Sequence, residues 1–89
     1  MRSRYYHILI LGEPKVNVSR VLQTINGEIK RFKIVQHEIY ASNSSLIPHT
    51  HIALELREPR LPIWLSKRFK VKLMYIELCH SSLIFEYLQ

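Results

Sequence analysis

The chain has 89 residues, of which 13 are Lys or Arg and 7 are Asp or Glu, so its formal net charge is +6. This length supports one domain, and a hydrophobic content of 47% with two glycines predicts an ordered fold rather than a flexible tail. No uncharged apolar run is long enough to span a membrane, and the basic N-terminus is followed by a strand-like segment, so we expect neither a membrane span nor a signal peptide. The one cysteine, Cys79, excludes an internal disulfide.

The first elements are a strand and a helix. Residues 4–11 are rich in aromatic and β-branched side chains, which predicts a strand. Asn17 is placed to cap a helix over residues 18–25, where apolar residues recur at helical spacing. Gly27 is placed to end that helix.

Two more strands follow, over residues 32–41 and 49–57, and the polar segment 42–45 between them predicts a hairpin. Because side chains alternate along a strand, one face of residues 49–57 carries Ile52, Leu54 and Leu56, and the other carries His49, His51, Ala53 and Glu55. We expect the apolar face to be covered by helices and the histidine face to be the working surface.

The second half repeats the helix-strand order. Pro59 and Pro62 frame the start of a helix over residues 63–69, a fourth strand is predicted over 71–78, and a last helix, capped by a preceding serine, over 83–89. The order β-α-β-β-α-β-α predicts an α+β fold, an antiparallel sheet with the split βαβ topology of ferredoxin-like and RRM-like domains. We expect helices on the sheet faces, with the first and third helices covering the sheet.

His49 and His51 project from one face of a strand and would form half a metal site. The predicted hairpin could bring the carboxylate of Glu38 beside them. Two imidazoles and one carboxylate suit divalent ions such as Mg²⁺ or Mn²⁺ and leave coordination positions open. The alternative is a polar sheet face without metal. We expect His37 to point away from this group, and His7 to be packed or solvated.

Tyr87, in the last predicted helix, is the candidate nucleophile for attack on a phosphodiester. A free phenol has a pKa of about 10, so it would need nearby positive charge or a metal ion. The alternative is an amphipathic tyrosine that packs near the chain end.

Six basic residues and one acidic residue lie between positions 57 and 72. Together with the net charge they favour a nucleic-acid partner. We expect them to lie along one element, and the candidate phosphate-binding residues are Arg57, Lys67, Lys70 and Lys72. A solvated helix face is the alternative.

These motifs resemble the HUH-type replication initiator (Rep) endonuclease domains of circular single-stranded DNA viruses, of the geminivirus, nanovirus and circovirus kind. Residues 48–52, Pro-His-Thr-His-Ile, look like the family's histidine-hydrophobic-histidine motif, which proline usually precedes. Residues 34–38 look like the strand that supplies the acidic ligand, and 81–89 look like the helix of the Tyr-x-x-Lys motif, whose lysine would follow Gln89. The resemblance spans nearly the whole chain.

The resemblance implies metal-dependent nicking and rejoining of single-stranded or origin DNA in rolling-circle replication. It implies a Mg²⁺ or Mn²⁺ ion on Glu38, His49 and His51, a 5′-phosphotyrosine intermediate on Tyr87, and no other small-molecule cofactor. It further implies oligomers in a full-length context, no membrane partner, and a location in the host nucleus or otherwise the cytoplasm. A transposase-type single-tyrosine nuclease is a variant of this prediction. The other class is a non-catalytic nucleic-acid-binding module with an RRM-like sheet.

Overall fold

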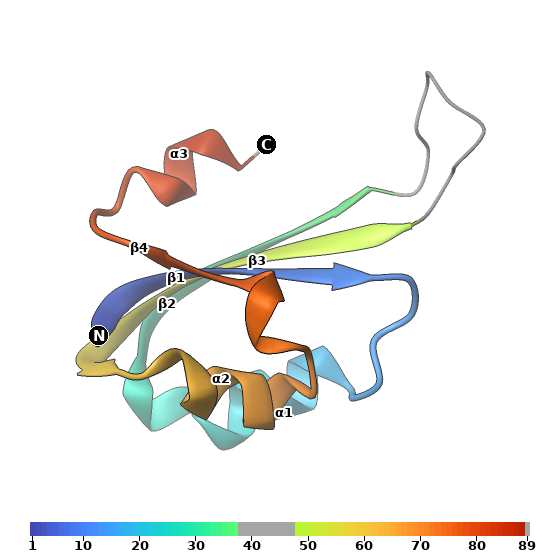
Figure 1. Ribbon diagram of the computed structural model, residues 1–89, viewed down its shortest axis with the longest axis horizontal. Helices are drawn as coiled ribbons and strands as arrows, with labels where there is room; N and C mark the ends of the chain where they lie inside the picture. The colour runs from blue at the N-terminus through green and yellow to red at the C-terminus, as the bar shows by residue number, and fades with distance from the viewer. Residues whose placement is uncertain (38–47, 89) are drawn as a thin grey trace.

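A four-stranded antiparallel sheet organises the computed structural model, which describes residues 1–37 and 48–88 (Figure 1). The strands are β1 (Ser3–Leu11), β2 (Ile29–His37), β3 (His49–Arg60) and β4 (Ile76–Cys79). Their order across the sheet is β2-β3-β1-β4, and each neighbouring pair is antiparallel. The predicted α+β fold with a ferredoxin-like or RRM-like sheet is therefore confirmed.

Helices lie on both faces of the sheet. Helices α1 (Val18–Thr24) and α2 (Pro62–Phe69) cover one face, and the one-turn helix α3 (Ile84–Tyr87) lies on the other (Figure 1). Two short 3₁₀ helices, η1 (Asn26–Glu28) and η2 (Leu73–Tyr75), precede β2 and β4. The expectation that the first and third helices cover the sheet together is wrong. The helix that shares a face of the sheet with α1 is α2, and α3 lies on the opposite face. No helix in the described residues is long and apolar enough to cross a membrane.

The core lies between the sheet and the layer formed by α1 and α2. The apolar alternation of the two central strands supplies one side of it, and the inward faces of the two helices supply the other. Its members are Tyr6, Ile8 and Ile10 of β1, Ile52, Leu54 and Leu56 of β3, Leu22, Ile25, Leu65 and Phe69 of the helical segments, and Ile29 and Ile76. Burial of these residues fixes which face of each strand is left for the histidines.

The start of α1 is as predicted, because the Asn17 Oδ1 accepts a hydrogen bond from the Arg20 backbone N–H at 3.0 Å. Gly27 does not end the helix in a left-handed conformation. It lies inside η1, and β2 begins at Ile29, three residues before the expected start. The side chain of Ile29 is buried in the core, which explains the earlier start of this strand.

Boundaries in the second half also differ from the prediction, and the last helix comprises Ile84–Tyr87 instead of 83–89. Pro62 begins α2 as expected, but Pro59 lies within β3, where the register with β1 shifts and a missing N–H is tolerated. Lys70 ends α2 in the left-handed conformation, with φ 52° and ψ 49°. The chain then turns through η2, so β4 comprises Ile76–Cys79 instead of the predicted 71–78.

Candidate functional site

Four histidines from three adjacent strands gather on the sheet face that carries α3. We call them the histidine cluster: His7 of β1, His37 of β2, and His49 and His51 of β3. Ring centroids lie 5.0 Å apart in the stacked pairs His7–His51 and His37–His49. The edge-to-face pairs His37–His51 and His49–His51 have centroids 5.2 and 4.9 Å apart.

Strand register brings these rings together. His37 lies directly opposite His49 in the β2–β3 ladder, so their side chains emerge on the same face. His7 lies opposite Ala53, two residues along β3 from His51, and shares the face as well. The prediction that His37 points away from His49 and His51 is therefore wrong, and His7 is part of the cluster rather than an isolated residue.

His7 has a polar neighbour on each side of its ring. Its Nε2 lies 2.8 Å from the Nδ1 of His51, and the two nitrogens share a hydrogen bond. Its Nδ1 lies 3.3 Å from the Oε1 of Glu77, on the neighbouring strand β4. Glu77 cannot be identified from the sequence alone, because only the pairing of β1 with β4 places it opposite His7.

The imidazole of His51 is held in its neutral form at physiological pH. Partial burial is the largest cause that lowers the pKa of His51 below its ordinary value of 6.5, and the neighbouring His7, His49 and His37 lower it further. A neutral imidazole is the form that binds a metal ion.

The predicted metal ligands are brought together only in part. His49 and His51 lie side by side, while Glu38 lies outside the described residues. Among residues 1–37 and 48–88, no three His, Cys, Asp or Glu side chains are placed as a group that could hold a metal ion. The donor chemistry of the two imidazoles nevertheless fits a divalent transition metal, with one or more further ligands required.

The C-terminal helix is fastened to the same face of the sheet. The Lys33 Nζ donates to the backbone carbonyls of Phe85, at 3.3 Å, and of Leu88. The Arg31 guanidinium carbon lies 4.0 Å from the centre of the Phe85 ring. Tyr87 is carried by this helix, and its side chain is 75% exposed, so its hydroxyl is accessible to a ligand.

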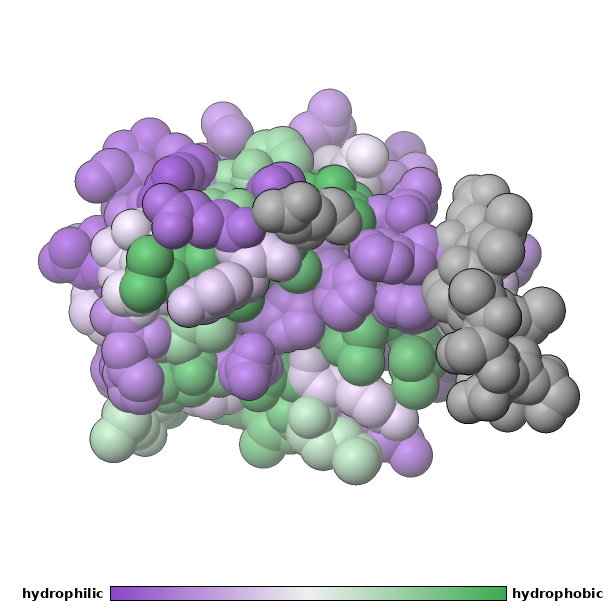
Figure 2. Space-filling view, turned by 90° about the horizontal axis from the view of Figure 1, so that it is seen from above, coloured by the Kyte–Doolittle hydropathy of each residue, from purple (hydrophilic) through white to green (hydrophobic). Residues whose placement is uncertain are grey.

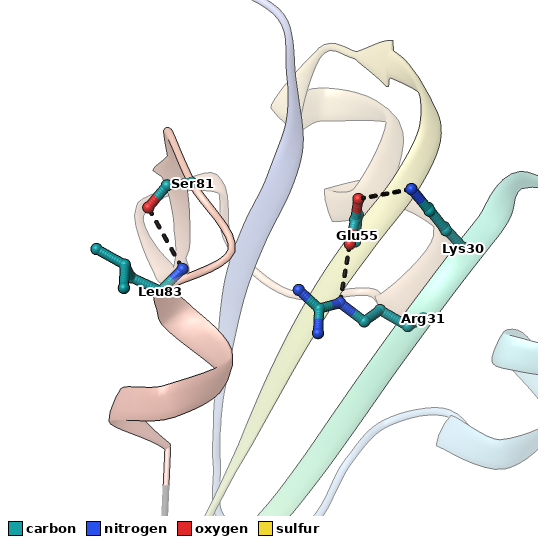
Figure 3. A network of polar contacts seen from close by, with 5 residues as sticks. All are labelled: Lys30, Arg31, Glu55, Ser81 and Leu83. Carbon is teal, nitrogen blue, oxygen red and sulfur yellow. Dashed lines mark hydrogen bonds and ion pairs between the residues drawn. The ribbon is translucent and has the colours of Figure 1, made fainter.

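A buried carboxylate supports this attachment (Figure 3). Glu55 is 6% exposed, and its Oε1 accepts a hydrogen bond from the Arg31 Nε at 2.8 Å, while Lys30 Nζ lies 3.6 Å from its Oε2. Burial alone would raise the pKa of the Glu55 carboxyl, but Arg31, Lys30 and Tyr5 together lower it below its ordinary value. Glu55 thus holds the arginine that packs on α3.

Glu55→Gln is expected to lower the free energy of unfolding at pH 7 by about 2 kcal/mol, because it removes a buried charge-assisted hydrogen bond. The folded-state pKa of Glu55 is below its unfolded value of 4.5, so the stabilisation is complete above pH 4.5 and is lost as the pH falls through the folded-state pKa. In urea denaturation at pH 7, 5 and 3, the free energy of unfolding should therefore fall more steeply with decreasing pH for the wild type than for the variant. Glu58→Gln, at an exposed position, is the control, and equal slopes for wild type and Glu55→Gln would contradict the prediction.

The basic residues do not follow one element, contrary to the expectation. Arg57 is in the end of β3, Lys67 is in the last turn of α2, and Lys70 and Lys72 follow that helix. Since α2 lies on the face opposite α3, Lys67 belongs to the helical layer rather than to the histidine face (Figure 1).

Lys70 and Lys72 join Lys15 around a pocket at the edge of β1. The pocket wall includes Leu9 and Leu11, which lie opposite His51 and His49 in the β1–β3 ladder. One acid, Glu13, also lines it. We call the three lysines the lysine edge, and their position beside β1 puts positive charge next to the strand that carries His7 of the histidine cluster.

Figure 2 views the molecule from the α3 side, and hydrophilic side chains are spread over this face with hydrophobic ones among them. Comparison of the chain with protein-family models, with curated proteins and with solved structures finds no match.

Proposed function

We propose that this chain is a metal-dependent nuclease domain of the HUH type, which nicks and rejoins single-stranded DNA at the origin of rolling-circle replication. The observation that carries the proposal is the placement of His49 and His51 side by side on the sheet face to which the helix bearing Tyr87 is fastened. A metal ion and a tyrosine nucleophile would have to act on one phosphodiester, so they must share a face.

The proposed ion is Mn²⁺ or Mg²⁺ on His49, His51 and Glu38. When bound, it would polarise a non-bridging phosphate oxygen as a Lewis acid. Imidazole ligands favour Mn²⁺ over Mg²⁺, which prefers oxygen donors, so Mn²⁺ is the better probe. His37 stacks on His49 at 5.0 Å, but among the described residues His37, His49 and His51 do not form a group of three that could hold a metal ion, so Glu38 remains the proposed third ligand.

The proposed reaction is a transfer of the phosphoryl group to Tyr87. The phenol loses its proton and its oxygen forms a bond to phosphorus, while the bond from phosphorus to the 3′ oxygen breaks and that oxygen leaves as a hydroxyl. The product is a 5′-phosphotyrosine and a free 3′ end. Attack of a 3′ hydroxyl on the same phosphorus reverses the step and rejoins the strand.

The test is covalent capture of DNA. The full chain is incubated with Mn²⁺ and a set of single-stranded oligonucleotides that carry origin-like hairpin and loop sequences, and the protein mass is measured under denaturing conditions. We expect a mass increase equal to the 3′-terminal cleavage fragment, which depends on the metal ion. A protein mass that is unchanged with all oligonucleotides, together with salt-dependent DNA binding whose affinity does not depend on Mn²⁺, would support a non-catalytic nucleic-acid-binding module instead.

The lysine edge is expected to contribute to DNA binding through phosphate contacts. With four or five such contacts, the slope of log affinity against log salt concentration should be about −3, at about −0.7 per phosphate for a single strand. Each of Lys70→Glu and Lys72→Glu should remove about 0.7 from the size of that slope. Arg20→Glu, a charge reversal at an exposed position in α1, is the matched control. A slope that changes as much in the control would assign the effect to net charge rather than to this edge.

A further inference from the structure

Glu77, His7 and His51 form a row across three neighbouring strands, β4, β1 and β3. Glu77 lies directly opposite His7 in the β1–β4 ladder, and its Oε1 is 3.3 Å from the Nδ1 of His7. The Nε2 of His7 is 2.8 Å from the Nδ1 of His51. Both ring nitrogens of His7 are thus engaged, and the row ends at the Nε2 of His51, which the geometry of the ring directs away from His7.

The proton positions along this row follow from the chemistry of its groups. A carboxylate only accepts hydrogen bonds, so the nitrogen that faces Glu77 carries the proton. A neutral His7 with its proton on Nδ1 has an acceptor at Nε2, and the shared proton then belongs to the Nδ1 of His51. The opposite arrangement of neutral rings would set a nitrogen lone pair against the carboxylate, which is repulsive.

We infer that Glu77 and His7 are positioning residues that hold His51 in the tautomer with its proton on Nδ1, which leaves the lone pair of Nε2 for a divalent cation. Metal-binding histidines commonly donate their other ring N–H to a fixed acceptor such as a carboxylate or a carbonyl, which fixes the ring and increases its basicity. For His51 the acceptor would be the Nε2 of His7. The inference rests on the proposed function, because the proposed metal ion is the group that would use this nitrogen.

The two positioning residues differ in how far their side chains are buried. The His7 side chain is 17% exposed, whereas that of Glu77 is 66% exposed. Water therefore screens the link from Glu77 to His7 more than the link from His7 to His51. We expect loss of the His7 acceptor to have the larger effect on His51.

The first experiment reads the tautomers in the metal-free protein. Long-range ¹H–¹⁵N NMR correlation spectra of the ¹⁵N-labelled full chain at pH 8, where free imidazoles are neutral, distinguish protonated from unprotonated ring nitrogens. We expect the proton on Nδ1 in both His7 and His51. Glu77→Ala should give a mixture of tautomers, and Glu77→Gln should keep the wild-type pattern, because its amide oxygen still accepts from the Nδ1 of His7.

The second experiment measures Mn²⁺ affinity by electron paramagnetic resonance. His7→Phe should weaken binding by about 10- to 100-fold, and Glu77→Ala by about tenfold, as other outer partners of metal ligands do. His7→Gln should restore most of the affinity, because its amide oxygen can take the place of the acceptor Nε2. Glu58→Ala makes the same charge change as Glu77→Ala at an exposed position away from the row, and should leave the affinity unchanged.

The outcomes separate this inference from the proposed function. A wild-type His51 with its proton on Nε2, or tautomers unaffected by Glu77→Ala, overturns the positioning role regardless of any metal result. Because Glu77 is largely exposed, this variant keeps the test open even where His7→Phe does not fold. The expected tautomers in a wild type that binds no Mn²⁺ would overturn the proposed nuclease while supporting the role of Glu77 and His7.

Discussion

Tyr87→Phe is expected to abolish the covalent protein–DNA adduct completely, while DNA binding and the fold remain close to those of the wild type. Phenylalanine lacks the hydroxyl that would attack phosphorus, so no phosphotyrosine can form. The side chain of Tyr87 is 75% exposed, and α3 is held by Lys33 and Arg31 rather than by this hydroxyl. Denaturing mass spectrometry after incubation with Mn²⁺ and oligonucleotide gives the adduct yield, and thermal unfolding checks the fold.

Tyr75→Phe is the matched control for this prediction. It removes one phenolic hydroxyl from the 3₁₀ helix η2, on a different element from Tyr87, and should retain the adduct. Adduct formation by Tyr87→Phe at the wild-type yield would show that another residue is the nucleophile. Loss of the adduct in both variants would point to a role of phenol groups in binding, which the salt dependence of DNA affinity would then reveal.

The fold was predictable to the extent that side-chain periodicity encodes it. Alternation in β1 and β3 identified the two central strands, and the side chain of Asn17 marked the start of α1. Periodicity failed where tertiary contacts decide the conformation. The segment before β4 has the alternating pattern of a strand, yet it turns through η2 after the left-handed Lys70.

The candidate site was predictable only within one strand. The spacing of His49 and His51 places both on one face whatever the rest of the sheet does. The positions of His7 and His37 depend on register between strands, and a shift by one residue would move each to the opposite face. The predicted placement of Glu38 beside the histidines put its neighbour His37 on the opposite face of the strand. Glu77 could not be found from the sequence, because only the pairing of β1 with β4 sets it opposite His7.

His51→Ala is expected to weaken Mn²⁺ binding by more than about 100-fold. Changes in the outer partners of a ligand cost about 10- to 100-fold, and removal of a ligand itself should cost more. His51 contacts every other member of the histidine cluster, and its lowered pKa favours the neutral form that binds a metal ion. His80→Ala, which removes an exposed histidine after β4, is the control and should leave affinity unchanged.

The same measurement identifies the third ligand. If the family-based prediction holds, Glu38→Ala should weaken Mn²⁺ binding nearly as much as His51→Ala, and His37→Ala should have a small effect. A small effect of Glu38→Ala would contradict the assignment of Glu38 as the third ligand. Equal affinity in wild type, His51→Ala and His49→Ala would exclude the sheet face as a metal site, and with it the proposed nuclease.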